Sequence, residues 1–270
     1  MKSELVDFEF KDRYDMDDLL YIMKILRSEK GCPWDKVQTH KSIRMDMIEE
    51  AYEACEAIDN DDSLHLREEL GDVLLQVVFH STIEEEQGNF TFADAVNDLC
   101  QKLVGRHPHV FGDVKADTVG EALSNWNDIK QADHGQETYT DTLNGVSKAF
   151  PALMRAQKVG KRSARAGLDF RSAEDALASL ESEIAEVRSA DKEHEAEELG
   201  DMLFAAVNTV RLKGYNAEEL LTRATEKFIG RFAAVEDMVR CEGLDMRSLD
   251  IDTLDTYWEK AKTTYGGNLT

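Results

Sequence analysis

The sequence lacks the features that would place the protein in a membrane. It has no run of about 18 apolar residues, and its N-terminus, MKSELVDFEFKDRYD, is too acidic for a signal or transit peptide. Only 3 of its 270 residues are proline, while 42% are hydrophobic and 32% charged, which favours a soluble helical protein over a β-sandwich or a disordered chain. We expect a cytoplasmic protein with no membrane partner, long enough for one large or two ordinary domains.

Paired cysteines and an excess of basic residues are also absent. The 4 cysteines show no C-x-x-C spacing, so the sequence suggests neither a zinc cage nor a disulfide framework. A formal net charge of −23 repels nucleic-acid backbones, and we expect no nucleic-acid partner. A polyanionic ligand would therefore need a local basic patch or a metal ion.

The alternating pattern of a β-strand is missing from both halves of the chain. Apolar residues instead recur at three-to-four spacing, and Thr91 is placed to begin one of the helices. The expected helical stretches are 16–31, 42–60, 64–88, 91–108, 174–190, 194–214 and 216–239. We predict an all-α protein with two helical-bundle units in tandem.

The pentapeptide EELGD occurs twice, at 68–72 and at 197–201, and its surroundings are repeated with it. Each copy follows an E-x-x-E pair and a histidine seven residues before its aspartate. Each precedes a K-x-x-x-R pair and then a W-x-x-x-K pair. Five features in the same order indicate an internal duplication. The histidines, His65 and His194, are expected at the surface rather than among ligands.

Carboxylates separated by three residues project from adjacent turns of one helix face. Two antiparallel helices could thus direct four carboxylates at one point, where they would repel one another unless a cation neutralised them. An all-oxygen set favours Mg²⁺, with Mn²⁺ as a substitute, over zinc. The following Lys and Arg, four residues apart, could hold phosphate oxygens. The pattern predicts metal-assisted hydrolysis of a polyphosphate ester.

With these residues in place, the sequence resembles the MazG family, tandem-domain nucleoside triphosphate pyrophosphohydrolases of the all-α NTP pyrophosphatase group. The signature of that family is E-E-x-x-E followed by E-x-x-D on the next helix. The resemblance covers nearly the whole chain and includes GCPWDKVQTH, RHPHVFGD and EKFIGRF. It implies cleavage of a nucleoside triphosphate to a monophosphate and pyrophosphate, Mg²⁺ on the carboxylates, and homodimers.

The resemblance also assigns roles residue by residue. The implied metal ligands are Glu50, Glu53, Glu69 and Asp72 in the first module and Glu183, Glu186, Glu198 and Asp201 in the second. The implied substrate contacts are Lys227, Arg231 and Trp258, with Lys102 and Arg106 as the counterparts in the first module and Lys262 as a weaker candidate.

The two modules differ at one signature position. The first has the doublet Glu49-Glu50, whereas the second reads Ser182-Glu183 and is one carboxylate short. We nevertheless expect the second module to be the catalytic site, because its EKFIGRF segment and its tryptophan-containing tail are complete. Its four acidic residues are the expected catalytic residues. The intact first signature supports the rival hypothesis that both modules act.

We predict MazG-like modules at 1–133 and 171–270, joined at 134–170 by a linker and a basic connecting helix. Between Thr142 and Leu168 there are six basic residues and no acidic one. This segment is interpreted either as a helix packed against acidic bundles or as a funnel for phosphates. The alternative functions are a nucleotide or alarmone-binding regulator with little turnover, and a narrower (d)NTP or phosphoribosyl-ATP pyrophosphohydrolase.

Overall fold

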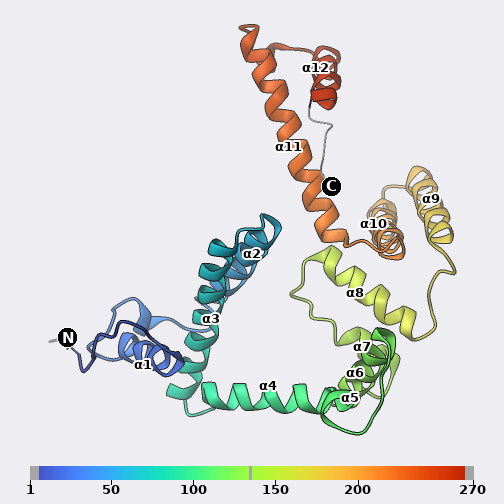
Figure 1. Ribbon diagram of the computed structural model, residues 1–270. Helices are drawn as coiled ribbons and strands as arrows, with labels where there is room; N and C mark the ends of the chain where they lie inside the picture. The colour runs from blue at the N-terminus through green and yellow to red at the C-terminus, as the bar shows by residue number, and fades with distance from the viewer. Residues whose placement is uncertain (1–5, 134–135, 265–270) are drawn as a thin grey trace. The chain divides into compact units, whose positions relative to one another are not determined.

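The computed structural model describes residues 6–133 and 136–264, and within these ranges it contains α-helices, two short 3-10 helices and no β-strand (Figure 1). The predicted all-α class is confirmed. None of the described helices is both long and apolar enough to cross a bilayer. The helices are α1 (Met16–Arg27), α2 (Asp46–Asp59), α3 (Ser63–Glu86), α4 (Phe92–Arg106), α5 (Pro108–Phe111), α6 (Val119–Asp133), α7 (Tyr139–Asn144), α8 (Ala152–Arg165), α9 (Ala173–Ser189), α10 (Glu195–Leu212), α11 (Ala217–Cys241) and α12 (Ile251–Thr264), with 3-10 turns at Asp35–Val37 and Met246–Ser248.

Side-chain caps explain where several helices begin. Asp62 accepts hydrogen bonds from the backbone N–H groups of Leu64 and His65 and so starts α3. Thr91 and Asp94 form a reciprocal capping box at α4, as the sequence predicts for a helix that begins at Thr91. Caps of this kind satisfy backbone donors that have no partner within the helix. The first residues of α3 and α4 are thus encoded locally.

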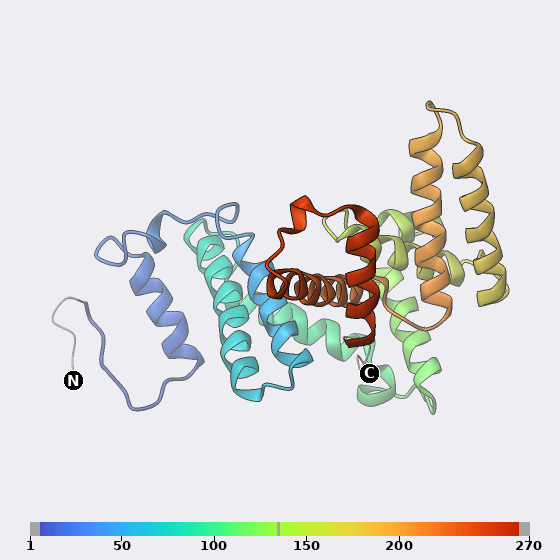
Figure 2. The ribbon, with the colours of Figure 1, turned by 90° about the horizontal axis from the view of Figure 1, so that it is seen from above.

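The chain forms two compact units, residues 1–129 and 130–270, with the boundary inside α6. In the first unit α2 and α3 form an antiparallel hairpin and lie side by side in both ribbon views (Figures 1 and 2). The apolar core joins Met23 of α1 and Ile43 to Val78, Phe79 and Ile83 of α3. This core occupies the C-terminal half of α3. The N-terminal half of α3, which carries Glu69 and Asp72, therefore lies beyond it and faces α2.

The second unit repeats the hairpin with α9 and α10, which also lie side by side in both views (Figures 1 and 2). Helix α8 packs on α10 at Gly160, whose backbone closely approaches the side chains of Asn208 and Arg211. Helix α11 is joined to α8 at its first residues, where the Ala217 N–H donates to Gln157 Oε1 at 2.8 Å. Its other end packs with α12 around Val235, Val239, Tyr257 and Ala261.

Candidate metal and nucleotide site

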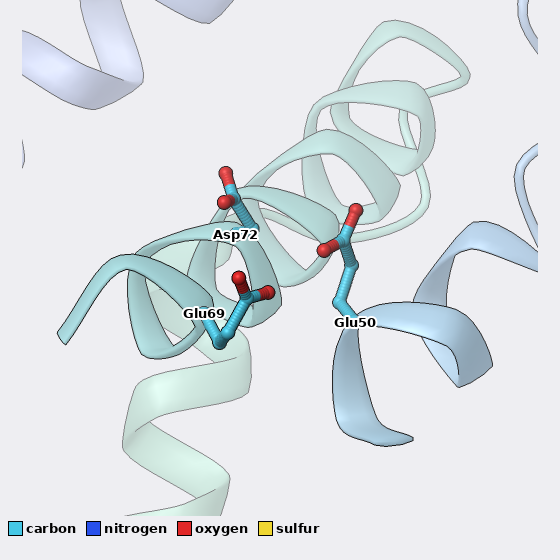
Figure 3. Close-up of side chains that lie close together, drawn as sticks. All are labelled: Glu50, Glu69 and Asp72. Atoms are coloured by element: carbon cyan, nitrogen blue, oxygen red, sulfur yellow. The ribbon is translucent and has the colours of Figure 1, made fainter. Parts of the chain in front are cut away.

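In the first unit, carboxylates from α2 and α3 converge. Glu50 of α2 and Glu69 and Asp72 of α3 each offer an oxygen, and these oxygens lie within 4.8 Å of one another (Figure 3). Glu69 and Asp72 are three residues apart, so they share one face of α3 opposite Glu50. Glu53, the fourth predicted ligand, is outside this group, and its assignment stays a prediction.

The electrostatics of this group are unfavourable without a counterion. Burial raises the pKa of Glu50, and the charges of Asp72, Glu53 and Glu69 raise it further. Burial and the charge of Glu53 likewise raise the pKa of Glu69, whereas His65 acts in the opposite direction. The charge of Glu53 therefore raises the pKa of both Glu50 and Glu69, even though Glu53 lies outside the group. Like charges held together in this way are typical of a cation site.

The second unit brings together Glu183, Glu186 and Glu198, again with donor oxygens within 4.8 Å. Asp201, predicted as the fourth ligand, lies outside the group, although its charge contributes to the raised pKa of Glu183. Burial is the largest cause of that shift, followed by Glu186. Both hairpins therefore place three carboxylates from two helices at one point.

The departure at Ser182 has a structural role that the sequence did not reveal. Ser182 Oγ donates to Glu186 Oε1 at 3.1 Å, so the second module has a hydroxyl donor where the first has the extra carboxylate Glu49. A serine four residues before a glutamate is too common on helices to be recognised from sequence as a contact of this kind.

The basic and aromatic residues of the repeat come together in the first unit, whereas in the second the tryptophan packs on α11, the helix that carries the basic pair. In the first unit, the guanidinium of Arg106 lies over the Trp126 ring, 5.4 Å from its centroid, and Arg106 is buried. In the second, Trp258 packs against Phe228 with centroids 5.1 Å apart. Arg231 is half-buried, and its Nε has no hydrogen-bond partner. Such a donor is suited to an anionic ligand.

The remaining predicted contacts are exposed. Lys102 and Lys227 lie on the exposed faces of α4 and α11, and Lys262 pairs with Glu259 of its own helix at 2.5 Å. Among the described residues, no ion pair joins Lys227 or Arg231 to the acidic group of the second unit. Lys227 is ten residues beyond the Ala217 contact, or about 15 Å along α11. The acidic and basic parts of the predicted site are therefore carried by separate segments.

Most of the basic residues of α8 are exposed. Arg155, Lys158 and Lys161 lie at the surface, and Lys158 sits 5.1 Å from the centroid of the Phe150 ring. Arg162 is half-buried instead and donates to the Thr142 carbonyl. Lys148 and Arg165, the other basic residues of the segment, are exposed as well, and the phosphate-funnel interpretation stays a prediction.

Both acidic groups fit a hard divalent cation by their chemistry. All donors are carboxylate oxygens, the ligands that Mg²⁺ and Mn²⁺ prefer. In the first group, Glu69 is 6% exposed and its Oε2 is buried without a hydrogen-bond partner. A buried, unpartnered carboxylate oxygen is costly unless something binds it.

Comparison with known proteins identifies the family of the chain. The chain is 41% identical over 247 residues to the nucleoside triphosphate pyrophosphohydrolase/pyrophosphatase MazG of Thermotoga maritima, covering 91% of this chain and 95% of that protein. It is 42% identical over 254 residues to the nucleoside triphosphate pyrophosphohydrolase of Escherichia coli K12, covering 92% and 97%. The chain belongs to the MazG family.

A MazG nucleotide pyrophosphohydrolase domain is matched directly at residues 38–111. That range contains the Glu50, Glu69 and Asp72 group and the basic residues Lys102 and Arg106. An uncharacterised protein of Bacillus subtilis is also 42% identical over 248 residues, which make up 90% of this chain but 50% of that protein.

Proposed function

We propose that the protein hydrolyses nucleoside triphosphates to nucleoside monophosphates and pyrophosphate, with Mg²⁺ as the cofactor and Mn²⁺ as a substitute. The observation that carries the proposal is the duplicated convergence of three carboxylates between paired helices, in a chain of the MazG family. Its modules are proposed to span 1–133 and 171–270, joined by 134–170.

In the second module, Glu183, Glu186, Glu198 and Asp201 would hold the cation, which when bound neutralises triphosphate charge and polarises the reacting phosphoryl group. Lys227 and Arg231 would bind phosphate oxygens, Arg231 through its planar fork, and Trp258 would stack on the nucleotide. Lys262, paired with Glu259, is assigned a weaker contact.

The reaction consumes one water and breaks the anhydride bond between the α- and β-phosphoryl groups. A carboxylate of the acidic group accepts the proton of the attacking water, and pyrophosphate or the monophosphate departs with the bridging oxygen.

We further propose that the active form is a homodimer. Large apolar side chains are exposed beside both acidic groups, among them Tyr52 and Leu70 in the first unit and Leu203 in the second. Helix α11 adds Leu221 and Ile229, each more than half exposed. A second copy that covered these faces could also supply Lys227 and Arg231 to the acidic group, to which no described ion pair links them within one chain.

The test is phosphorus NMR of the products formed from a panel of NTPs and dNTPs with Mg²⁺. Pyrophosphate and monophosphate are expected from the wild type. Glu198→Gln/Asp201→Asn should reduce turnover by at least about 100-fold, the range seen when a main electrostatic contact is removed. Glu197→Gln, an exposed neighbour on α10, is the matched control and should retain activity.

The same substitutions in the first module, Glu69→Gln/Asp72→Asn, identify the catalytic module. Loss of turnover in that variant alone would place the reaction in the first module, and loss in both would mean that both are needed. Orthophosphate with a nucleoside diphosphate would contradict the proposal. Nucleotide binding without turnover in the folded wild type would favour the regulatory alternative.

A further inference from the structure

His65 contacts the most buried carboxylate of the first acidic group. His65 Nε2 lies 2.9 Å from Glu69 Oε1, one helical turn away on the same face of α3. The two side chains form an ion pair when the imidazole is protonated. The backbone N–H of His65 donates in turn to Asp62, the cap of the helix, at 3.0 Å. The position of Glu69 is thus tied to the start of α3.

The two oxygens of Glu69 have different surroundings. Oε1 faces His65, whereas Oε2 is buried and has no hydrogen-bond partner. The side chain is 8% exposed, and Figure 3 shows its carboxyl group directed towards the space shared with Glu50 and Asp72. The close contact of His65 with Oε1 therefore restricts the orientation of the carboxyl group, while Oε2 has no hydrogen-bond partner and is open to a ligand.

The second module lacks this arrangement, although it has a histidine at the corresponding place in the repeat. His194 is the N-cap residue of α10, and its Nδ1 lies 2.8 Å from Asp191 in the preceding turn. The hydrogen bond to a cluster carboxylate there is made by Ser182 to Glu186, and both residues are exposed. Water competes with an exposed contact of this kind, so it orients the carboxylate less strongly.

We infer that His65 is a positioning residue that orients Glu69 for a divalent cation, so that the first module binds the cation without nucleotide and more tightly than the second. The inference rests on the proposed function for the nature of the cation. Partners that orient metal-binding carboxylates reduce the entropy lost on binding, and their removal typically weakens metal affinity about 10–100-fold.

The test is titration of the full-length, nucleotide-free protein with Mn²⁺, followed by the electron paramagnetic resonance signal of the free ion. The Glu198→Gln/Asp201→Asn background isolates the first site, and Glu69→Gln/Asp72→Asn isolates the second. In the first background, His65→Ala should raise the Kd for Mn²⁺ by about 10–100-fold. His65→Gln, whose amide can donate to Oε1, should restore most of the affinity.

Matched controls come from the second module. His194→Ala should leave its weaker Mn²⁺ affinity unchanged, because the imidazole contacts Asp191 and not the acidic group. Ser182→Ala should weaken that affinity less than His65→Ala weakens the first site, because the contact of Ser182 with Glu186 is exposed. Far-ultraviolet circular dichroism and melting curves establish that each variant is folded. If His65→Ala does not fold, His65→Gln and His65→Leu are compared with the wild type instead. The glutamine variant should then keep its Mn²⁺ affinity, and the leucine variant should lose it.

An unchanged Kd in folded His65→Ala, or equal losses in the glutamine and leucine variants, would overturn the role of His65. Equal Mn²⁺ affinity in the two backgrounds would overturn the ranking of the modules. Turnover is measured separately on the wild type. If the wild type hydrolyses nucleotides but Mn²⁺ binding does not depend on His65, only this inference is overturned. If Mn²⁺ binds as expected but no nucleotide is hydrolysed, only the proposed function is overturned.

Discussion

Glu50 is a residue whose charge should destabilise the metal-free protein. Burial and four neighbouring carboxylates raise its pKa in the folded state above the unfolded value. The folded protein therefore gains stability from this group at low pH, where Glu50 is protonated, and loses it as the pH rises through the raised pKa. A bound divalent cation should reverse that loss.

We expect Glu50→Gln to melt higher than the wild type at pH 7 in a chelator, and to gain less from added Mg²⁺. Relief of one like-charge helix pair is worth about 0.2–0.5 kcal/mol, so a rise in melting temperature of about 0.5–2 °C is expected. Differential scanning calorimetry at pH 5 and pH 7 measures it, and Glu56→Gln, exposed on the same helix, is the control. A lower melting temperature for Glu50→Gln in chelator would contradict this account.

The sequence predicts the residue types of the site better than their individual contacts. The repeat identifies every carboxylate that the two groups contain. It gives no sign that Glu69 is buried or that His65 and His194 have different partners, because these depend on where α3 and α10 begin relative to the turns before them. Identical spacing in the chain thus produces two unequal sites.

At the scale of the elements, the contact of α8 with α10 depends on Gly160. A Cβ at this position would lie 2.5 Å from Asn208 Oδ1 and 3.0 Å from Arg211 Nε. Asn208 Oδ1 accepts from Arg211 Nε at 3.1 Å, and Arg211 also pairs with Asp169. The space beside Gly160 is therefore filled by a polar network that anchors α10 to the turn after α8.

Gly160→Ala should destabilise the second unit even though alanine favours helices, because the added methyl group displaces this network. Overpacking of this kind costs about 1–3 kcal/mol. Urea unfolding followed by circular dichroism measures the loss, and Gly200→Ala on α10, where a Cβ meets no atom within 4 Å, is the matched control. If Gly160→Ala has the same free energy of unfolding as Gly200→Ala, α8 and α10 can move apart to accept the methyl group at no cost in stability.

Helix positions were more predictable than helix packing. Caps such as Thr91 and the apolar spacing are local signals, so the sequence locates the long helices to within a few residues. The close approach at Gly160 is not a local signal, since any exposed helical glycine has the same sequence appearance. The hydrogen bond from Ala217 to Gln157, 60 residues away, was likewise beyond sequence patterns.

At the scale of the whole molecule, the all-α class follows from the sequence, because apolar periodicity is a property of each helix. The sequence does not, however, identify the partner that would cover α11. Between Leu220 and Phe232 this helix is exposed at nearly every position, including four large apolar residues that are more than two-fifths exposed: Leu221, Phe228, Ile229 and Phe232. A long helix with such a face is rarely stable alone in water.

If a second copy covers this face, the protein should have twice the chain mass of 30.5 kDa in solution, as measured by light scattering after gel filtration. Leu221→Glu/Ile229→Glu places two charges in the proposed interface and should yield monomers. Because Lys227 and Arg231 would then be withdrawn from the partner's acidic group, hydrolysis should fall together with the dimer fraction. Arg223→Glu, an exposed polar position of α11, should retain both dimer and activity. An active monomer would show instead that the basic residues of one chain act together with its own carboxylates.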